Sequence, residues 1–427
     1  MVAQALTFVL RLGSLMVLAR LLGPHEYGLV GMVTAFTGVL GLFRDFGLST
    51  ATVQRKDITN EQISTLFWVN VLVGIALAAV SFVFSPLVAT FYREPKLFHI
   101  MAVLAIGFIF NALGVQHSAV LQRQMRFTEM SVINVVALVV STVVAIVMAV
   151  SGFGYWSLVA MSIVFPLTAT IGFWIVGGWV PGRPHTGIGL VSIMRFGGIL
   201  TLNGIVTYVA YNLEKVLLGR FWGADAIGFY GRAYQIVSIP TDNLNAAVGE
   251  VAFSALSRVQ NDPTKLKNYF LRGYSIVLAL TVPCTMLFAL FATDLMTVVL
   301  GAKWKETGEI FRLLAPTVLV FAMINPTSWL LFALGQVEKS LKIAIVIAPL
   351  AVLGYVIGLP WGAKGVAIGY SSAMIVWVLP HLAWCAQGTN ISFCDFLDAA
   401  KRPLISGLLA SGAVLVILPI LGSISLP

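Results

Sequence analysis

Polar and charged side chains recur at helical spacing inside segments that are otherwise apolar. Near the N-terminus, Gln4, Thr7, Arg11 and Ser14 lie three, four and three positions apart, so a helix would carry them on one face. A charged group inside the membrane is costly, so a face that carries a guanidinium group with hydroxyl and amide groups should turn toward protein or water rather than toward lipid. These residues are therefore candidates for a functional site.

A second polar face follows 200 residues later and corresponds to the first. Its members are Asn203, Thr207, Tyr211 and Glu214. A shift of 200 positions superposes Thr7 on Thr207 and Arg11 on Tyr211. Lys215 lies one position from this face, and the side to which it points stays open.

The next apolar segment adds Arg232, Gln235 and Asp242 on a shared face. A charge at the bilayer centre costs about 2.5–3.5 kcal/mol, so these groups should face protein or water rather than lipid. Two interpretations of Glu214 and Arg232 stay open. They form either a structural ion pair between neighbouring helices or a pair that opens and closes with substrate.

The composition defines the elements that position these residues. Hydrophobic residues make up 59% of the 427 residues and charged residues 10%, with a mean hydropathy of +0.95. No soluble core of this size could bury so much apolar surface, so we predict an all-α, polytopic membrane protein. About thirteen apolar runs have spanning length, and they lie near 2–22, 27–43, 65–91, 97–121, 132–150, 154–180, 196–218, 226–250, 273–299, 309–334, 341–359, 365–386 and 403–422.

A sequence repeat divides the predicted helices into two halves. Leu18-Ala-Arg-Leu-Leu-Gly-Pro-His-Glu-Tyr-Gly-Leu-Val-Gly31 returns as Leu218-Gly-Arg-Phe-Trp-Gly-Ala-Asp-Ala-Ile-Gly-Phe-Tyr-Gly231. In each copy an apolar helix ends on Arg, a glycine stands where a left-handed cap would lie, and two glycines open the next helix and permit close packing. The matched residues are Arg20, Gly23, Gly28 and Gly31 with Arg220, Gly223, Gly228 and Gly231.

The repeat predicts two parallel six-helix lobes around a central cleft, related by an axis along the membrane normal. The assigned parts are an N-terminal lobe at 1–180, a cytoplasmic linker at 181–195, a C-terminal lobe at 196–388, and a further linker with a terminal helix at 389–427. Six plus six helices account for twelve. Whether the thirteenth is half of a terminal pair that this chain cuts short stays open.

The distribution of Lys and Arg predicts the orientation. Most of them lie in loops that follow even-numbered helices, such as Arg55, Arg123, Arg126 and Lys265. The positive-inside rule therefore places the N-terminus and the even-numbered loops in the cytoplasm. The net charge of +9 then reflects topology and attraction to anionic membrane lipids, not a nucleic-acid surface.

Residue types that bind metals or form covalent intermediates are scattered. Cys284, Cys385 and Cys394 make no metal or redox spacing, and the histidines lie apart in loops and at helix ends. An integral-membrane enzyme would usually show a long extracytoplasmic loop with clustered acids, Arg or His, and this pattern contains none. We therefore predict no catalytic residue, metal site or cofactor, and a protein that is not an enzyme.

Several motifs carry a resemblance that runs through nearly the whole chain. They are Leu18-Ala-Arg-Leu-Leu-Gly-Pro24, Asp45-Phe-Gly-Leu-Ser49, Ser64-Thr-Leu-Phe-Trp-Val-Asn70, Gly152-Phe-Gly-Tyr-Trp-Ser-Leu158, Asn212-Leu-Glu-Lys-Val-Leu-Leu-Gly-Arg220 and Leu300-Gly-Ala-Lys-Trp304. In order and spacing they resemble the polysaccharide flippases of the Wzx or PST type, in the superfamily that also holds lipid II flippases and multidrug and toxin extruders. The similarity is to the branch that exports succinoglycan, colanic acid and related exopolysaccharides.

This resemblance implies translocation of undecaprenyl diphosphate-linked oligosaccharide repeat units across the bacterial inner membrane, for exopolysaccharide, O-antigen or capsule biosynthesis. Alternating rocking of the two lobes would expose the cleft to either side. The residues expected to bind the diphosphate are Arg11, Lys215 and Arg232. The residues expected to meet the sugars are Asn203, Tyr208, Asn212 and Gln235.

Glu214 stands where the family pattern usually has Asp, which preserves a carboxylate. It is the first candidate for coupling to a proton or sodium gradient, and Asp242 is the second. Expected partners besides the substrate are membrane lipids, with a polysaccharide polymerase and a chain-length regulator as further candidates. The alternative function is a drug or toxin extruder of the same fold, which would rely on carboxylates to bind cationic amphiphiles.

Overall fold

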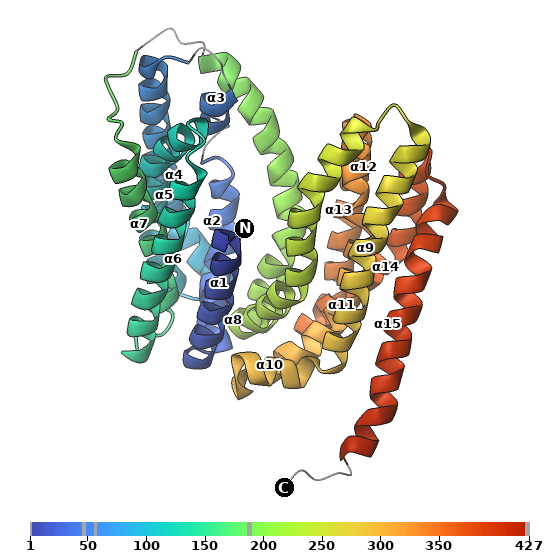
Figure 1. Cartoon of the computed structure of the whole chain (residues 1–427). Coiled ribbons are helices and arrows are strands. Elements are labelled where there is room, and N and C mark those ends of the chain that lie inside the picture. Colours follow the sequence, from blue (N-terminus) through green and yellow to red (C-terminus); the bar gives the residue numbers. More distant parts are fainter. Residues whose placement is uncertain (1, 45–47, 55–57, 186–189, 423–427) are drawn as a thin grey trace. The chain divides into compact units, whose positions relative to one another are not determined.

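Every regular element that the structure describes is a helix, as predicted. The computed structural model describes residues 2–44, 48–54, 58–185 and 190–422 (Figure 1). Side chains at 2–5, 50, 51, 54, 190–207, 209–211, 240, 242–247, 250 and 417–422 lie outside this description. Contacts divide the chain into two compact units, Met1–Gly228 and Phe229–Pro427.

The first unit is a helical bundle whose helices follow the predicted apolar runs. Its elements are α1 (Val2–Leu21), α2 (Pro24–Gly41), α3 (Leu48–Gln54), α4 (Asn60–Tyr92), α5 (Lys96–Arg123), α6 (Phe127–Val150), α7 (Trp156–Gly177) and the first part of α8 (Leu190–Arg258). The short helix α3 falls in a stretch that the sequence pattern left as a connection. It is too short and too polar to show an apolar spanning run.

The second unit continues from the latter part of α8. Its further helices are α9 (Pro263–Leu290), α10 (Ala292–Leu300), α11 (Lys305–Ile324), α12 (Thr327–Ala333), α13 (Val337–Gly358), α14 (Gly362–Ala386) and α15 (Phe393–Gly422), with single 3-10 turns at Ala302–Trp304 and Leu359–Trp361. Aromatic side chains hold its core. Phe270 stacks on Tyr274, and both meet the ring of Phe396 edge-on, with centroid separations of 5.6–5.7 Å.

Local sequence signals define several helix starts. Thr59 caps α4: its hydroxyl accepts the backbone N–H of Gln62, and the Gln62 side chain accepts the backbone N–H of Thr59. Asp262 caps α9 by accepting the backbone N–H of Lys265, with Pro263 at the first helical position. These bonds satisfy N–H groups that a helix start otherwise leaves unpaired.

Eight helical segments of the described chain are long and apolar enough to cross a membrane. One of them, Val337–Ala386, holds two helices, α13 and α14. Gly354 lies against Gly369 and Gly358 against Gly365, which is the register of an antiparallel hairpin. At 1.5 Å per residue each arm approaches the thickness of a bilayer core, so this segment crosses twice. The protein is a multi-pass membrane protein.

The two copies of the repeated motif pack against each other within the first unit. A Cβ placed on Gly28 would lie 1.8 Å from the carbonyl oxygen of Ala224, and one placed on Gly228 would lie 2.0 Å from the carbonyl oxygen of Pro24. Since Ala224 is the counterpart of Pro24 under the shift of 200 positions, the two contacts are reciprocal. A Cβ on Gly31 would lie 2.8 Å from the side chain of Ile227, whereas one on Gly231 would meet nothing within 4 Å. The prediction that these glycines permit close helix packing is confirmed for Gly28, Gly31 and Gly228 but not for Gly231.

The predicted left-handed cap at Gly23 is wrong. Gly23 is extended, with φ −98° and ψ 177°, and its N–H donates to a carboxylate oxygen of Glu26 at 2.8 Å. The reason is the following Pro24, because a residue that precedes proline is driven away from helical backbone angles. Gly223 has no proline after it and takes φ +82°, ψ −172° at the break inside α8. This conformation favours glycine, but its ψ lies far from the left-handed helical value near +47°, so the predicted cap is also wrong in the second copy.

We predict that Gly28→Ala and Gly228→Ala each lower the melting temperature of the purified protein by several degrees. The added methyl group would overlap a backbone carbonyl, which cannot rotate away as a side chain can. Gly13→Ala and Gly41→Ala are the matched controls, since a Cβ at either position meets nothing within 4 Å. Alanine in a helix also removes the entropic cost of glycine, about 1 kcal/mol, so the controls should melt at or above the wild-type temperature. Equal melting of all four variants would contradict the close contact.

Candidate functional site

Three of the predicted site residues form a hydrogen-bonded row on α8. The side-chain amide of Asn212 donates to the backbone oxygen of Tyr208 at 2.9 Å, and the ammonium of Lys215 donates to the amide oxygen of Asn212 at 2.7 Å. All three side chains are partly buried. Spacings of four and three residues place them on one helix face, so Lys215 belongs to this face. We call Tyr208, Asn212 and Lys215 the α8 polar row.

The row is held against α2 by its tyrosine. The hydroxyl of Tyr208 donates to the backbone oxygen of Thr34 at 3.1 Å. Gly38, one turn further along α2, leaves the space that the ring occupies, because a Cβ there would lie 1.9 Å from the hydroxyl oxygen. The position of Tyr208 therefore depends on a glycine of the neighbouring helix.

Glu214 lies next to Lys215 in sequence and is buried. Glu214 is 2% exposed, and its Oε2 atom has no hydrogen-bond partner among the described residues. A carboxylate buried in this way is costly unless it is paired or protonated. Lys215, the next residue, is only partly buried, so the two adjacent charged residues differ in burial.

The helix that ends in the first motif copy carries the other predicted cation of this unit. Arg11 is exposed on α1, while Ser14, one turn later, is buried and donates its hydroxyl to the backbone oxygen of Arg11 at 2.9 Å. The first polar face is therefore exposed at Arg11 and covered at Ser14. Arg220 is the counterpart of Arg20 in the second motif copy. Its guanidinium carbon lies 5.6 Å from the centroid of the Phe91 ring, a cation–π distance.

Two of the predicted residues lie in the second unit and are described there by themselves. Arg232 is partly buried, and its guanidinium donates to the side-chain oxygen of the exposed Gln235. This bond joins the two on one face, one turn apart, as their spacing predicts. The side chains of Asn203 and Asp242 lie outside the described residues, so their predicted roles stay predictions.

A buried polar network in the first unit was not singled out from the sequence. Asn70 donates to the side-chain oxygen of Gln116 at 3.2 Å, and Gln116 donates to the Thr52 hydroxyl at 2.6 Å. Arg123 then donates to the backbone oxygen of Thr52 at 2.8 Å. Asn70, Gln116 and Thr52 are fully buried. The network fastens α3 to α4 and α5. The signal that the sequence offered was an amide side chain within each apolar run, Asn70 in one and Gln116 in the other.

The described residues contain no group of three or more His, Cys, Asp or Glu side chains that could hold a metal ion. The amide, hydroxyl and cationic groups above are instead suited to hydrogen bonding and to charge pairing with an anion. The arrangement can bind a polar, negatively charged ligand.

The fold has a counterpart among solved structures. A lipid II flippase, MurJ, in an inward closed conformation, superposes with a TM-score of 0.77 at 16% sequence identity, covering 96% of this chain and 92% of that protein. At this identity the likeness concerns the fold, and it defines the class: an all-helical membrane protein with the MurJ architecture.

Sequence comparison then gives the family. The model of the polysaccharide biosynthesis protein family matches residues 17–309, so the chain belongs to that family. The lipopolysaccharide biosynthesis protein WzxC of Escherichia coli (strain K12) is 28% identical over 88% of this chain and 77% of its own length. The succinoglycan biosynthesis transport protein ExoT of Rhizobium meliloti (strain 1021) is 24% identical over 94% of this chain and 82% of its own length. The family resemblance inferred from the motifs is confirmed.

We predict that Tyr208→Phe lowers the free energy of unfolding by about 0.5–1.5 kcal/mol, the usual contribution of one hydrogen bond. The ring still fills the space beside Gly38, but the bond to Thr34 is lost. Denaturant titration of the purified protein measures the change. Tyr269→Phe is the control, because Tyr269 is 54% exposed. A change no larger than that of the control would contradict the role of the Tyr208 hydroxyl.

Proposed function

We propose that this protein is a flippase that moves undecaprenyl diphosphate-linked oligosaccharide repeat units across the bacterial cytoplasmic membrane, for the synthesis of an exopolysaccharide or related polymer. The observation that carries the proposal is the α8 polar row, which places a hydroxyl, an amide and an ammonium group on one face of a helix in a multi-pass membrane protein. Family membership and the names of WzxC and ExoT support the substrate class.

The physical need for such a row follows from the substrate. A sugar hydroxyl moved from water into hydrocarbon without a partner costs about 4–8 kcal/mol, so an oligosaccharide head group cannot cross lipid unaided. Asn212 and Tyr208 offer hydrogen bonds to it. Gln235 in the second unit and Asn203 are proposed to do the same.

The diphosphate requires cations. Lys215 donates one of its three ammonium hydrogens to Asn212, which leaves two for phosphate oxygens. Arg11 and Arg232 are proposed as the further cations, and an arginine suits phosphate because its guanidinium can donate two parallel hydrogen bonds. Charge-assisted hydrogen bonds of this kind contribute about 1.5–3 kcal/mol each.

Movement is proposed to follow alternating access, with the repeated halves rocking against each other. Its energy source is proposed to be a proton or sodium gradient. The buried carboxylate of Glu214 is the first candidate for the coupling group, since a proton or cation there would remove the cost of an unpaired buried charge. Asp242 is the second. The protein then acts by binding and movement, without a catalytic residue or cofactor.

The cationic character of the site favours a lipid diphosphate over the cationic amphiphiles that an extruder of related fold would carry. The proposed location is the inner membrane, with the N-terminus in the cytoplasm. A polysaccharide polymerase and a chain-length regulator are proposed as the proteins that use the translocated unit.

We predict that Arg11→Ala with Lys215→Ala and Arg232→Ala reduces polymer export by at least about tenfold, because each lost charge-assisted bond weakens diphosphate binding. The assay uses a strain that lacks the flippase gene and carries each variant at wild-type level. An impermeant sugar-oxidising label reports which leaflet holds the lipid-linked oligosaccharide, and unlabelled material should accumulate on the cytoplasmic side.

Lys96→Ala with Lys303→Ala is the matched control, since both lysines are exposed and lie outside the proposed site. It should export normally. Normal export by the triple variant would contradict the proposed cationic site, whereas normal leaflet distribution in the deletion strain, with no second flippase present, would contradict the proposed function.

We predict opposite accessibility for two loop positions. Asn261 and Ser151 are both exposed. Each is replaced by cysteine, one at a time, in a variant that lacks the three native cysteines. In intact cells an impermeant maleimide should label Ser151→Cys, which follows the fifth predicted apolar run at 132–150. It should label Asn261→Cys, which follows the eighth run at 226–250, only after permeabilisation. The reverse pattern would contradict the proposed orientation.

A further inference from the structure

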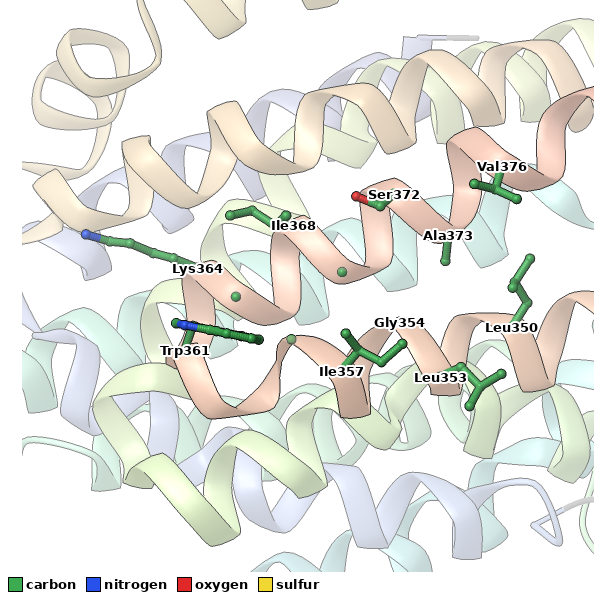
Figure 2. A pocket seen from close by; sticks show the side chains of 13 residues that line it. Leu350, Leu353, Gly354, Ile357, Trp361, Lys364, Ile368, Ser372, Ala373 and Val376 are labelled. Carbon is green, nitrogen blue, oxygen red and sulfur yellow. The ribbon is translucent and has the colours of Figure 1, made fainter.

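The hairpin of α13 and α14 carries an apolar groove that the proposed transport site does not use. Its volume is about 790 Å³. Figure 2 shows Leu350 and Val376 at one end and Trp361 with Lys364 at the other. The side chains that line the groove between these ends are aliphatic, apart from the hydroxyl of Ser372.

Glycines form the floor of this groove for a structural reason. A Cβ on Gly358 would lie 2.0 Å from the carbonyl oxygen of Gly365, and one on Gly369 would lie 2.1 Å from that of Gly354. The backbones of the two helices therefore touch along the seam. Because these positions have no side chains, the seam stays open toward the outside of the hairpin.

The walls of the groove face away from the protein interior. Leu353, Ile357, Ile368 and Val376 are 51–67% exposed. In a membrane-spanning hairpin such side chains meet hydrocarbon. The groove body offers too few polar groups to bind sugar or phosphate, so its occupant is an apolar chain.

The length of the groove identifies the kind of chain. From Leu350 to Gly358 the helix α13 rises about 12 Å at 1.5 Å per residue, and the 3-10 turn to Trp361 adds about 6 Å. The total of about 18 Å is a little over half of the roughly 30 Å hydrocarbon core. The groove therefore spans one leaflet. A phospholipid acyl chain fits this depth, whereas an undecaprenyl chain is far longer than one leaflet.

The polar end of the groove carries both signs of charge. The ammonium of Lys364 lies 2.5 Å from a carboxylate oxygen of Glu309, and both side chains are 46% exposed. Trp361, 71% exposed, lies beside them, as tryptophans do at membrane interfaces. An exposed ion pair complements a zwitterionic head group, since the ammonium can bind its phosphate and the carboxylate can bind its amine.

We propose that this groove is a binding site for one phosphatidylethanolamine molecule, with an acyl chain along the glycine floor and the head group on Lys364 and Glu309. The site lies on the lipid-facing side of the hairpin and is independent of the proposed transport function. Its polar end is in the loop that the positive-inside rule places outside the cytoplasm. The lipid is therefore one of the outer leaflet.

The test is photocrosslinking in nanodiscs made of phosphatidylethanolamine and phosphatidylglycerol. A trace of phosphatidylethanolamine with a diazirine in its acyl chain is irradiated, and crosslinked peptides are identified by mass spectrometry. Crosslinks should concentrate at residues 350–376. Leu353→Trp with Ile368→Trp fills the groove and should reduce them about tenfold, which corresponds to about 1.4 kcal/mol of binding.

The matched control is Ile345→Trp with Ile375→Trp, since both residues are similarly exposed on the same helices but lie outside the groove. It should leave the crosslinks unchanged. Lys364→Ala with Glu309→Gln should reduce crosslinking by phosphatidylethanolamine, whereas Lys303→Ala should not.

Four outcomes would overturn the proposal. The first is crosslinking that the groove-filling variant does not reduce, and the second is equal or stronger crosslinking by a phosphatidylglycerol probe. The third is displacement of the probe by unlabelled undecaprenyl phosphate, which would assign the groove to a polyprenyl chain. The fourth is a dimer in wild-type nanodiscs that the groove-filling variant dissociates, which would assign the groove to a second copy of the chain.

Discussion

The contact between the two motif copies is the constraint on which the first unit depends. Gly28 lies against the backbone of Ala224 and Gly228 against the backbone of Pro24, so each copy supplies both a glycine and the carbonyl that the glycine admits. Exchange of the copies reproduces the same pair of contacts, as in a two-fold interface between identical subunits. Without side chains at these positions, α2 and α8 can approach to backbone contact, and dispersion between closely packed atoms holds them without a need for polar groups.

The polar features of the site follow from this approach. Because α2 and α8 are close, the Tyr208 hydroxyl reaches the backbone of Thr34 and its ring fits beside Gly38. Asn212 and Lys215 follow at spacings of four and three residues and therefore lie on the same face of α8 as Tyr208. Lys215 then joins Tyr208 and Asn212, while Glu214 turns to a buried position. A partly buried ammonium group and a buried carboxyl group thus lie on adjacent residues of α8.

Much of this fold could be predicted from the hydrophobic composition, the length of the apolar runs and the sequence repeat. Apolar runs of spanning length gave the helices, and the repeated glycines predicted close packing, because both signals depend on local sequence. The backbone of Gly23 could not be read from the repeat, since Pro24 is present in one copy and alanine in the other. The direction of Lys215 was open because a position between two faces is settled by tertiary contact. The network of Asn70, Gln116 and Thr52 joins helices far apart in sequence, and no local pattern reports such a partner.

The most direct test is transport by the purified protein. The wild-type chain is reconstituted into liposomes that contain a fluorescent undecaprenyl diphosphate-linked oligosaccharide in both leaflets, and an impermeant reductant is added outside. If the protein is a flippase, the reductant should quench nearly all of the fluorescence, including that of label that starts in the inner leaflet. With the triple variant of Arg11, Lys215 and Arg232, the inner-leaflet fraction should be quenched more slowly. Protection of the inner-leaflet label to the extent seen in protein-free liposomes, with and without an imposed proton or sodium gradient, would contradict translocation by this protein.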